Sequence, residues 1–187
     1  MIRFNCDYSE GAHPKVLQAL ADTNLRQTVG YGMDPCCQAA ADTIRRLCAA
    51  PDAAVHFLVG GTQVNLVTID AFLQSYEAVV AAQTGHVSTH ETGAIEATGH
   101  KVCTVESPDG KLTPALVESV LAGHNGTEHM VLPRMVYISD TTEIGTVYTR
   151  AELAALRQCC DVHGLFLYLD GARLGSALTS PDNDLTL

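Results

Sequence analysis

The stretch LFLYLDGAR, residues 165–173, joins an apolar run to the charged sequence Asp170-Gly171-Ala172-Arg173. A short apolar run bounded by turn residues is typical of a strand buried on both faces, as in parallel sheets covered by helices. Residues 150–163, just before it, carry apolar side chains at helical spacing. The sequence therefore predicts a helix followed by a buried strand over 165–169 that ends at Asp170.

Strand and helix alternate in the same way along the rest of the chain. Further strands are predicted at residues 53–59, 77–82, 101–105 and 135–139. Further helices are predicted at residues 14–20, 35–48, 63–74, 90–98 and 114–121. This alternation predicts an α/β fold, a three-layer α/β/α sandwich around a mostly parallel sheet. Ligands of such sheets bind beyond the carboxyl ends of the strands, so polar residues that directly follow strands are the candidate site residues.

Composition limits the classes of function. The chain of 187 residues is 47% hydrophobic, which is enough for the core of one domain. It carries 21 acidic and 11 basic side chains, and the basic ones are scattered, which argues against a nucleic-acid or anionic-membrane surface. The sequence shows neither a signal peptide nor a membrane-spanning segment, so we expect a cytoplasmic protein.

The seven cysteines are expected to be reduced thiols. Their number is odd, and two pairs are adjacent in helix-like segments, where a bridge between neighbours would be strained. C-x-x-C spacing is absent, so we expect no structural zinc cluster of that type.

The first candidate segment is Gly60-Gly61-Thr62-Gln63, between a predicted strand and a predicted helix. Backbone amides and a hydroxyl at a helix N-terminus favour an anion such as a phosphate. No Gly-Lys-Ser/Thr follows, so the segment is not a nucleotide P-loop. A plain turn with a helix cap is the alternative.

The second candidate segment is Asp170-Gly171-Ala172-Arg173. A carboxylate at the bottom of a pocket can pair with a pyridinium nitrogen, which strengthens pyridoxal phosphate (PLP) as an electron sink. The guanidinium of Arg173 is a planar fork suited to a carboxylate or phenolate oxygen. The alternative is an Asp-Gly turn with a surface salt bridge.

The third candidate segment is residues 86–91, HVSTHE, which follow a predicted strand. The imidazole of His86 could stack on a cofactor ring, and Glu91 could orient a neighbouring polar group. His86 and His90 are four residues apart and could instead bind a metal, although the motif H-E-x-x-H is absent. An ordinary polar helix face is the third possibility.

The fourth candidate segment is residues 139–145, SDTTEIG, again beyond a predicted strand. The carboxylate of Glu143 could accept a hydroxyl proton if a pocket holds it near the substrate. A solvated cap is the alternative, because loops of this composition commonly cap neighbouring helices.

Taken in order, these segments resemble the threonine aldolase and β-eliminating lyase family of PLP-dependent enzymes of fold type I. The resemblance extends over essentially the whole chain, and the joint order and spacing of its motifs are more specific than any single one. It is carried by residues 4–11 (FNCDYSEG), 31–35 (YGMDP), 61–66 (GTQVNL), His86, 90–96 (HETGAIE) and 170–173 (DGAR).

The resemblance implies a role for each matching position. The implied cofactor-binding residues are Gly61, Thr62, Gln63, His86, Asp170 and Arg173. The first three would hold the PLP phosphate, His86 would stack on the pyridine ring, and Asp170 would pair with the ring nitrogen. Arg173 would contact either the phenolic oxygen of PLP or the substrate carboxylate. The implied catalytic residues are His86, Glu143, Asp170 and Arg173, the implied substrate-binding residues are Cys6, Asp7 and Glu91, and no metal is expected.

For the whole protein, the resemblance implies an aldehyde-lyase that cleaves β-hydroxy amino acids such as L-threonine and L-allo-threonine to glycine and an aldehyde. In such enzymes a base removes the β-hydroxyl proton, the Cα–Cβ bond breaks, and PLP takes up the electrons. The alternatives are another PLP-dependent amino-acid lyase, acting by β-elimination, and a non-catalytic PLP-binding protein. The full-length protein is expected to be a homodimer or homotetramer.

The sequence departs from the family in three places. The lysine that attaches PLP is expected some tens of residues after Asp170, and this chain contains none there. All lysines precede it, at Lys15, Lys101 and Lys111. Residues 1–187 are therefore expected to be the N-terminal segment and most of the large domain, without the small C-terminal domain, and to be inactive alone. Cys6 stands where many relatives carry a serine, and Glu143 lies near a family histidine, which leaves the base and the exact substrate open.

Overall fold

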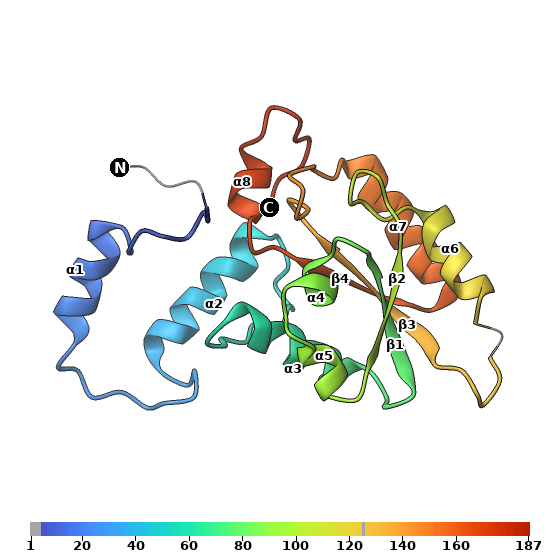
Figure 1. Cartoon of the computed structure of the whole chain (residues 1–187). Coiled ribbons are helices and arrows are strands. Elements are labelled where there is room, and N and C mark those ends of the chain that lie inside the picture. The colour runs from blue at the N-terminus through green and yellow to red at the C-terminus, as the bar shows by residue number, and fades with distance from the viewer. Residues whose placement is uncertain (1–4, 125) are drawn as a thin grey trace. The chain divides into compact units, whose positions relative to one another are not determined.

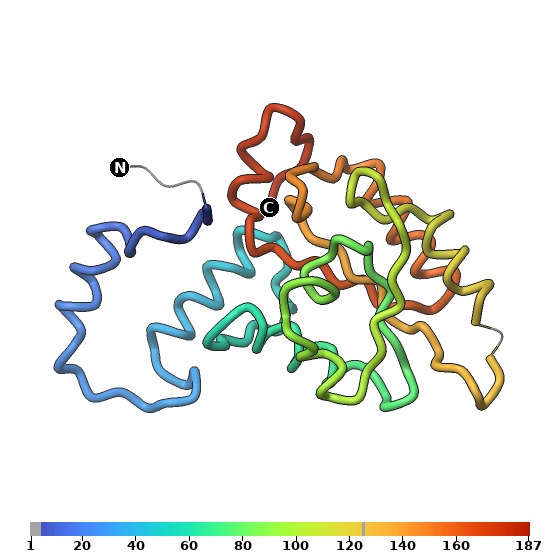
Figure 2. The backbone as a smooth tube through the Cα atoms, in the orientation of Figure 1, coloured from blue at the N-terminus to red at the C-terminus, as the bar shows by residue number. Residues whose placement is uncertain are grey.

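The computed structural model describes residues 5–124 and 126–187. The chain separates into two compact units, Met1–Phe57 and Leu58–Leu187, and each is described by itself. Among the described residues, the first unit contains two helices, and the second contains a sheet with its covering helices (Figures 1 and 2).

The two helices of the first unit are α1 (Pro14–Thr23) and α2 (Pro35–Leu47). Both begin with a proline, which suits the first turn because an N–H at that position has no intrahelical partner. The Asp34 carboxylate accepts hydrogen bonds from two backbone N–H groups in the first turn of α2, at 2.8 and 3.0 Å, and so caps this helix. Both predicted helices in this region are confirmed.

Within the described residues, the second unit is built on a sheet of four parallel strands. They are β1 (Glu77–Ala82), β2 (Lys101–Val105), β3 (Leu132–Ser139) and β4 (Phe166–Asp170). Their order in space is β2-β1-β3-β4, and every neighbouring pair is parallel (Figure 1). The predicted strands at 77–82 and 101–105 are matched residue for residue, and the other two within three residues. The predicted parallel α/β architecture is confirmed.

Helices cover both faces of this sheet. They are α3 (Gly61–Phe72), α4 (His86–Thr89), α5 (Ala94–Ala97), α6 (Pro114–Ala122) and α7 (Arg150–His163). A further short helix, α8 (Leu174–Leu178), follows β4. Successive strand residues point to opposite faces. Val79 and Met135 therefore pack in one buried cluster with α3, α4 and α5, whereas their neighbours Val80 and Val136 pack in a second cluster with α6 and α7. The sheet is the middle of three layers (Figure 1).

The bounds of α7 coincide with the prediction because both of its ends are marked in the sequence. Thr149 and Glu152 form a capping box, in which each side chain accepts a hydrogen bond from the other residue's backbone N–H. Gly164 follows the helix with a φ of +65°, a left-handed conformation that glycine adopts without steric cost.

The predicted strand at 53–59 is wrong. These residues form no strand with any part of the chain that the structure describes, and most of their side chains are exposed, Val59 by 96%. An apolar run between a proline and a glycine is found both in buried strands and in irregular connections. Only a neighbouring strand decides between them, and the local sequence does not specify one.

The predicted helix at 90–98 is also corrected. Within this range the structure has only the short helix α5, and residues 90–93 separate it from α4, with φ values of +54° at Thr92 and +76° at Gly93. Left-handed residues cannot continue a right-handed helix, so the chain turns at this point. The helix predicted at 63–74 is confirmed as α3, which begins and ends two residues earlier. Across the described residues, we find no helix with the length and apolar content that crossing a membrane requires.

Candidate active site

The candidate site lies where the strand order of the sheet reverses. From β1 the chain continues to β2 on one side, and from β3 it continues to β4 on the other. Parallel sheets bind ligands at such a point, beyond the carboxyl ends of the strands. The segments that follow β1 and β3 meet here, because the backbone N–H of His86 donates a hydrogen bond to Oε1 of Glu143 at 2.9 Å.

A tight turn after β1 places His86. The backbone N–H of Gly85 donates to the carbonyl oxygen of Ala82 at 2.8 Å, and a Cβ at Gly85 would lie 3.0 Å from the same oxygen. A side chain at this position would therefore crowd the turn. The His86 ring then contacts Glu91, with Nδ1 and Oε1 2.8 Å apart, and the side chain of Glu91 is fully buried. A buried carboxylate thus sets the orientation of the imidazole.

Asn65, on the buried face of α3, connects Glu91 to Asp170. Its Nδ2 group donates to Oε1 of Glu91 and, at 3.2 Å, to Oδ2 of Asp170. Its Oδ1 accepts a hydrogen bond from the hydroxyl of Tyr168 at 2.6 Å. Both the nitrogen and the oxygen of the Asn65 side chain are therefore hydrogen-bonded. This side chain connects the segment after β1 to the end of β4.

Asp170, the last residue of β4, is half-buried and receives hydrogen bonds on both carboxylate oxygens. The hydroxyl of Tyr137 donates to Oδ2 at 2.6 Å, in addition to Asn65, and the backbone N–H of Ala172 donates to Oδ1 at 3.0 Å. Burial, followed by the hydrogen bond to Asp170 and the charge of that residue, raises the pKa of Tyr137, so its phenol is a donor at neutral pH. Asp170 is therefore a hydrogen-bond acceptor held in a fixed direction. This differs from the alternative of an Asp-Gly turn at the surface.

Glu143 is held in the same way beyond β3. Its Oε1 accepts a hydrogen bond from the hydroxyl of Ser139 at 2.6 Å as well as the one from the His86 backbone. The side chain is half-buried. These contacts hold the Glu143 carboxylate beside the segment that contains His86. A solvated helix cap, the alternative reading of this loop, would not be held in this way.

The start of α3 presents backbone amides, as the sequence predicted. Gly60 is the N-cap, and Val64 is the first residue to bond back to it, at 2.9 Å. The N–H groups before Val64 therefore have no carbonyl within the helix to bind. Gly61 and Thr62 are exposed, whereas the side-chain oxygen of Gln63 accepts a hydrogen bond from the backbone N–H of Val59 at 3.0 Å.

The other predicted site residues are placed differently. Cys6 and Asp7 belong to the first unit, where the Cys6 thiol lies 2.9 Å from the Ser9 hydroxyl. Their role at the substrate therefore stays a prediction. Arg173 is half-buried at the N-cap of α8, three residues beyond Asp170.

Three residues of this network received no role from the sequence: Asn65, Tyr137 and Tyr168. A signal for the two tyrosines was present. Tyr137 lies beside Tyr168 in the register of β3 and β4, and Ser139 lies beside Asp170 two residues further along. Residues two apart on a strand share a face, so polar groups at this spacing near a strand end mark the face that carries the site.

Comparison with known proteins now gives the family. The sequence profile named Beta-eliminating lyase matches residues 7–186. This chain belongs to the beta-eliminating lyase family. Within the family, it is 37% identical over 177 residues to a low specificity L-threonine aldolase from Pseudomonas sp. (strain NCIMB 10558), covering 94% of this chain and 51% of that protein. The chain thus spans about half the length of the curated relatives it matches.

Solved structures agree with this family assignment. A threonine aldolase from Leishmania major superposes with a TM-score of 0.94 at 57% identity, over 96% of this chain and 52% of that one. An aspartate aminotransferase from Rhizobium meliloti, at 16% identity, superposes with a TM-score of 0.64 over 87% of this chain and 41% of that one, which shows a shared fold only. The predicted large-domain fold of fold type I PLP enzymes is confirmed.

Proposed function

We propose that this chain forms the cofactor-binding part of a PLP-dependent aldehyde-lyase that cleaves L-threonine and L-allo-threonine to glycine and acetaldehyde. The observation that carries the proposal is the Asp170 carboxylate, held by three donors in one network with Asn65, Glu91 and His86. PLP, when bound, supplies an electron sink for the electron pair released as the Cα–Cβ bond breaks.

The residues present fit PLP in their chemistry. Asp170 is a fixed acceptor for a protonated ring nitrogen, because all three of its partners are donors. The buried Oε2 of Glu91 has no hydrogen-bond partner among the described residues, so it is an acceptor that a bound polar group or water can satisfy. His86 supplies the planar ring that would cover the cofactor. Gly61, Thr62 and Gln63 would hold the phosphate at the N-terminus of α3.

Glu143 is our candidate for the group that accepts the β-hydroxyl proton. Its Oε1 is bound to Ser139 and to the His86 backbone, and these bonds fix the direction of the carboxylate. We assign Oε2 as the oxygen that receives the proton. Arg173 would hold the substrate carboxylate or the phenolic oxygen of PLP.

Two lysines of the second unit are not suited to attach the cofactor. Lys101 begins β2, at the end of the sheet opposite the carboxyl end of β4. Lys111 binds Oε1 of Glu152 at 2.6 Å. We therefore assign PLP attachment to neither. The proposal includes a homodimer or homotetramer located in the cytoplasm.

The test uses the protein expressed from its own complete gene and saturated with PLP. With L-threonine we expect equal amounts of glycine and acetaldehyde, and Asp170→Asn should abolish both while leaving the protein folded. Asp161→Asn, which changes only an exposed ion pair with Arg157, is the matched control. Release of ammonia and a keto acid in place of acetaldehyde would favour β-elimination and contradict the aldolase.

A further inference from the structure

Three side chains with metal-binding atoms meet between α6 and α7, which pack side by side on one face of the sheet (Figure 1). They are Glu118 of α6 and Cys159 and His163 of α7, and one ligand atom from each lies within 4.8 Å of the other two. We propose that Glu118, Cys159 and His163 bind a zinc ion that joins α6 to α7.

Helix geometry brings the three together. Cys159 and His163 are four residues apart, so they share one face of α7 at successive turns. Glu118 faces them from α6, with its Oε1 3.4 Å from Nε2 of His163. The Cys159 residue is only 7% exposed, whereas the side chains of Glu118 and His163 are 57% and 35% exposed. The thiol therefore forms the floor of the site, and an ion can reach it from solvent.

The donor set is one that zinc prefers. Thiolate, imidazole and carboxylate are the ligand types that zinc binds in proteins, and a water would complete tetrahedral coordination by these three side chains. Usual zinc–ligand bond lengths place the ligand atoms about 3.3–3.6 Å apart. The observed spacing reaches this range with small rotations of the two exposed side chains.

Charge also favours a divalent cation here. The Glu118 carboxylate contributes a negative charge close to the Cys159 sulfur, and among the three ligands only His163 can carry a positive charge. On binding, the S–H bond breaks, its proton leaves to solvent, and a zinc–sulfur bond forms. The ion then balances one thiolate and one carboxylate. A surface ion pair between Glu118 and His163 alone would contribute little and would not involve Cys159.

The site is independent of the proposed catalytic centre. Cys159 belongs to the buried cluster on the α6 and α7 face, whereas Tyr137 and Tyr168 belong to the opposite face. The sequence-based expectation of no metal rested on C-x-x-C and H-E-x-x-H spacings. The ligands here come from two helices, and such a set has no fixed spacing.

The test is metal binding by the full-length protein after treatment with a chelator. We expect one zinc ion per chain, competed by cobalt, and visible cobalt bands of tetrahedral, thiolate-containing coordination. Cys159→Ser, Glu118→Gln and His163→Gln should each weaken zinc binding by more than the roughly 10- to 100-fold that outer-shell changes cost. Cys159→Ser should also remove the thiolate bands. Zinc should raise the unfolding temperature of the parent protein and of none of these three variants.

Cys103→Ser is the matched control, because Cys103 is also buried and also lies near a histidine, 3.6 Å from Nε2 of His124. It should bind zinc like the parent. Unchanged binding in Glu118→Gln and His163→Gln, which alter only exposed side chains, would overturn the proposal even if Cys159→Ser failed to fold. Metal binding tests the zinc site, whereas aldolase activity tests the proposed function. The two proposals can therefore fail independently.

Discussion

Asp170 receives its shortest hydrogen bond from Tyr137, whose hydroxyl lies 2.6 Å from Oδ2. Both groups sit at carboxyl ends of neighbouring strands, so the phenol is fixed before any ligand arrives. Tyr168 acts one step further away, through Asn65, and burial raises its pKa to about 12. Both tyrosines are therefore donors over the physiological pH range, and they keep the acceptor atoms of the carboxylate pointing in set directions.

Tyr137→Phe removes this donor and leaves the ring in place. Hydrogen bonds to charged groups contribute about 1.5–3 kcal/mol. We expect PLP affinity to fall about tenfold, the lower end of that range, because Asn65 and Ala172 still hold Asp170. Titration of the apoprotein with PLP, followed by absorbance, measures this change. Tyr76→Phe, at an exposed position, should bind as the parent does, and equal affinity in both variants would contradict the role of Tyr137.

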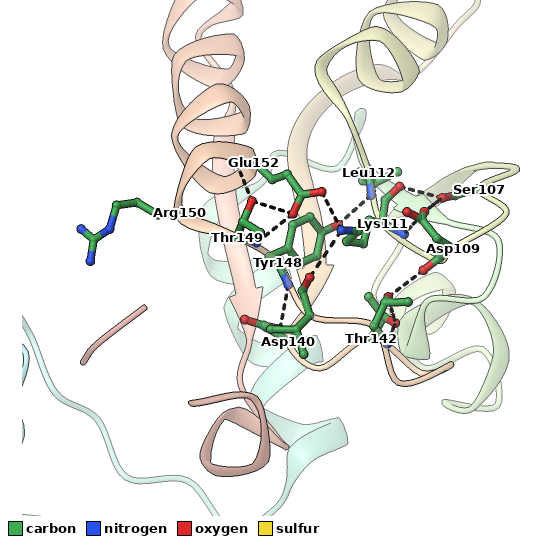
Figure 3. Close-up of polar contacts among 12 residues, drawn as sticks. Ser107, Asp109, Lys111, Leu112, Asp140, Thr142, Tyr148, Thr149, Arg150 and Glu152 are labelled. Atoms are coloured by element: carbon green, nitrogen blue, oxygen red, sulfur yellow. Dashed lines mark hydrogen bonds and ion pairs between the residues drawn. The ribbon is translucent and has the colours of Figure 1, made fainter. Parts of the chain in front are cut away.

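At the scale of elements, the loop between β3 and α7 is fixed by a buried acid (Figure 3). Asp140 is fully buried, its Oδ1 accepts a hydrogen bond from the backbone N–H of Tyr148 at 3.3 Å, and its Oδ2 has no partner among the described residues. Burial raises the pKa of Asp140, against smaller lowering effects of the Tyr148 N–H and the Lys111 charge. As the pH rises, the Asp140 carboxyl therefore stays protonated to a higher pH in the folded chain than in the unfolded chain.

The raised pKa of Asp140 predicts a pH dependence of stability. The stability contributed by the neutral acid is present in full below the unfolded pKa and is lost as pH rises toward the folded pKa, by about 1.4 kcal/mol per pKa unit of difference. The asparagine in Asp140→Asn cannot ionise. The free energy of unfolding of this variant should therefore increase relative to that of the parent as the pH rises through this window. Urea unfolding at a series of pH values measures it. The exposed Asp182→Asn should keep the parental slope, and a parental slope in Asp140→Asn would contradict the assignment.

At the scale of the whole molecule, the two units differ in how much they bury. In the described part of the first unit only Ala41 is buried, whereas both hydrophobic clusters belong to the second unit. The connection between them is exposed, Phe57 by 47% and Leu58 by 42%. Local opening is easiest where few apolar side chains are buried.

Limited digestion with chymotrypsin should therefore cut first at positions before Gly61 and leave a resistant fragment that contains the sheet. Mass spectrometry of the early products identifies the cuts. Phe57→Ser should remove the cut at the connection and leave the others. Early cleavage at Tyr137 or Tyr148, both buried in the second unit, would show that the sheet opens as readily as the first unit.

Local sequence was enough for the elements whose ends carry their own signals. The strands at 77–82 and 101–105 and the helix at 150–163 lie where the sequence predicted them, because apolar runs, caps and the glycine at 164 act within a few residues. We selected His86, Glu91, Glu143 and Asp170 from the sequence because they follow predicted strands. In the structure His86 contacts both Glu91 and Glu143 directly. Asp170 is connected to Glu91 through the side-chain amide of Asn65.

Tertiary structure alone decided which distant residues meet. Asn65 and Asp170 are 105 positions apart in the chain, and their contact depends on α3 packing on the face that β4 presents. The irregular course of 53–59 and the meeting of Glu118 with Cys159 depend in the same way on neighbours far along the chain. Local patterns specify which face of an element is buried, but its partner is set by strand order and helix packing across the whole sheet.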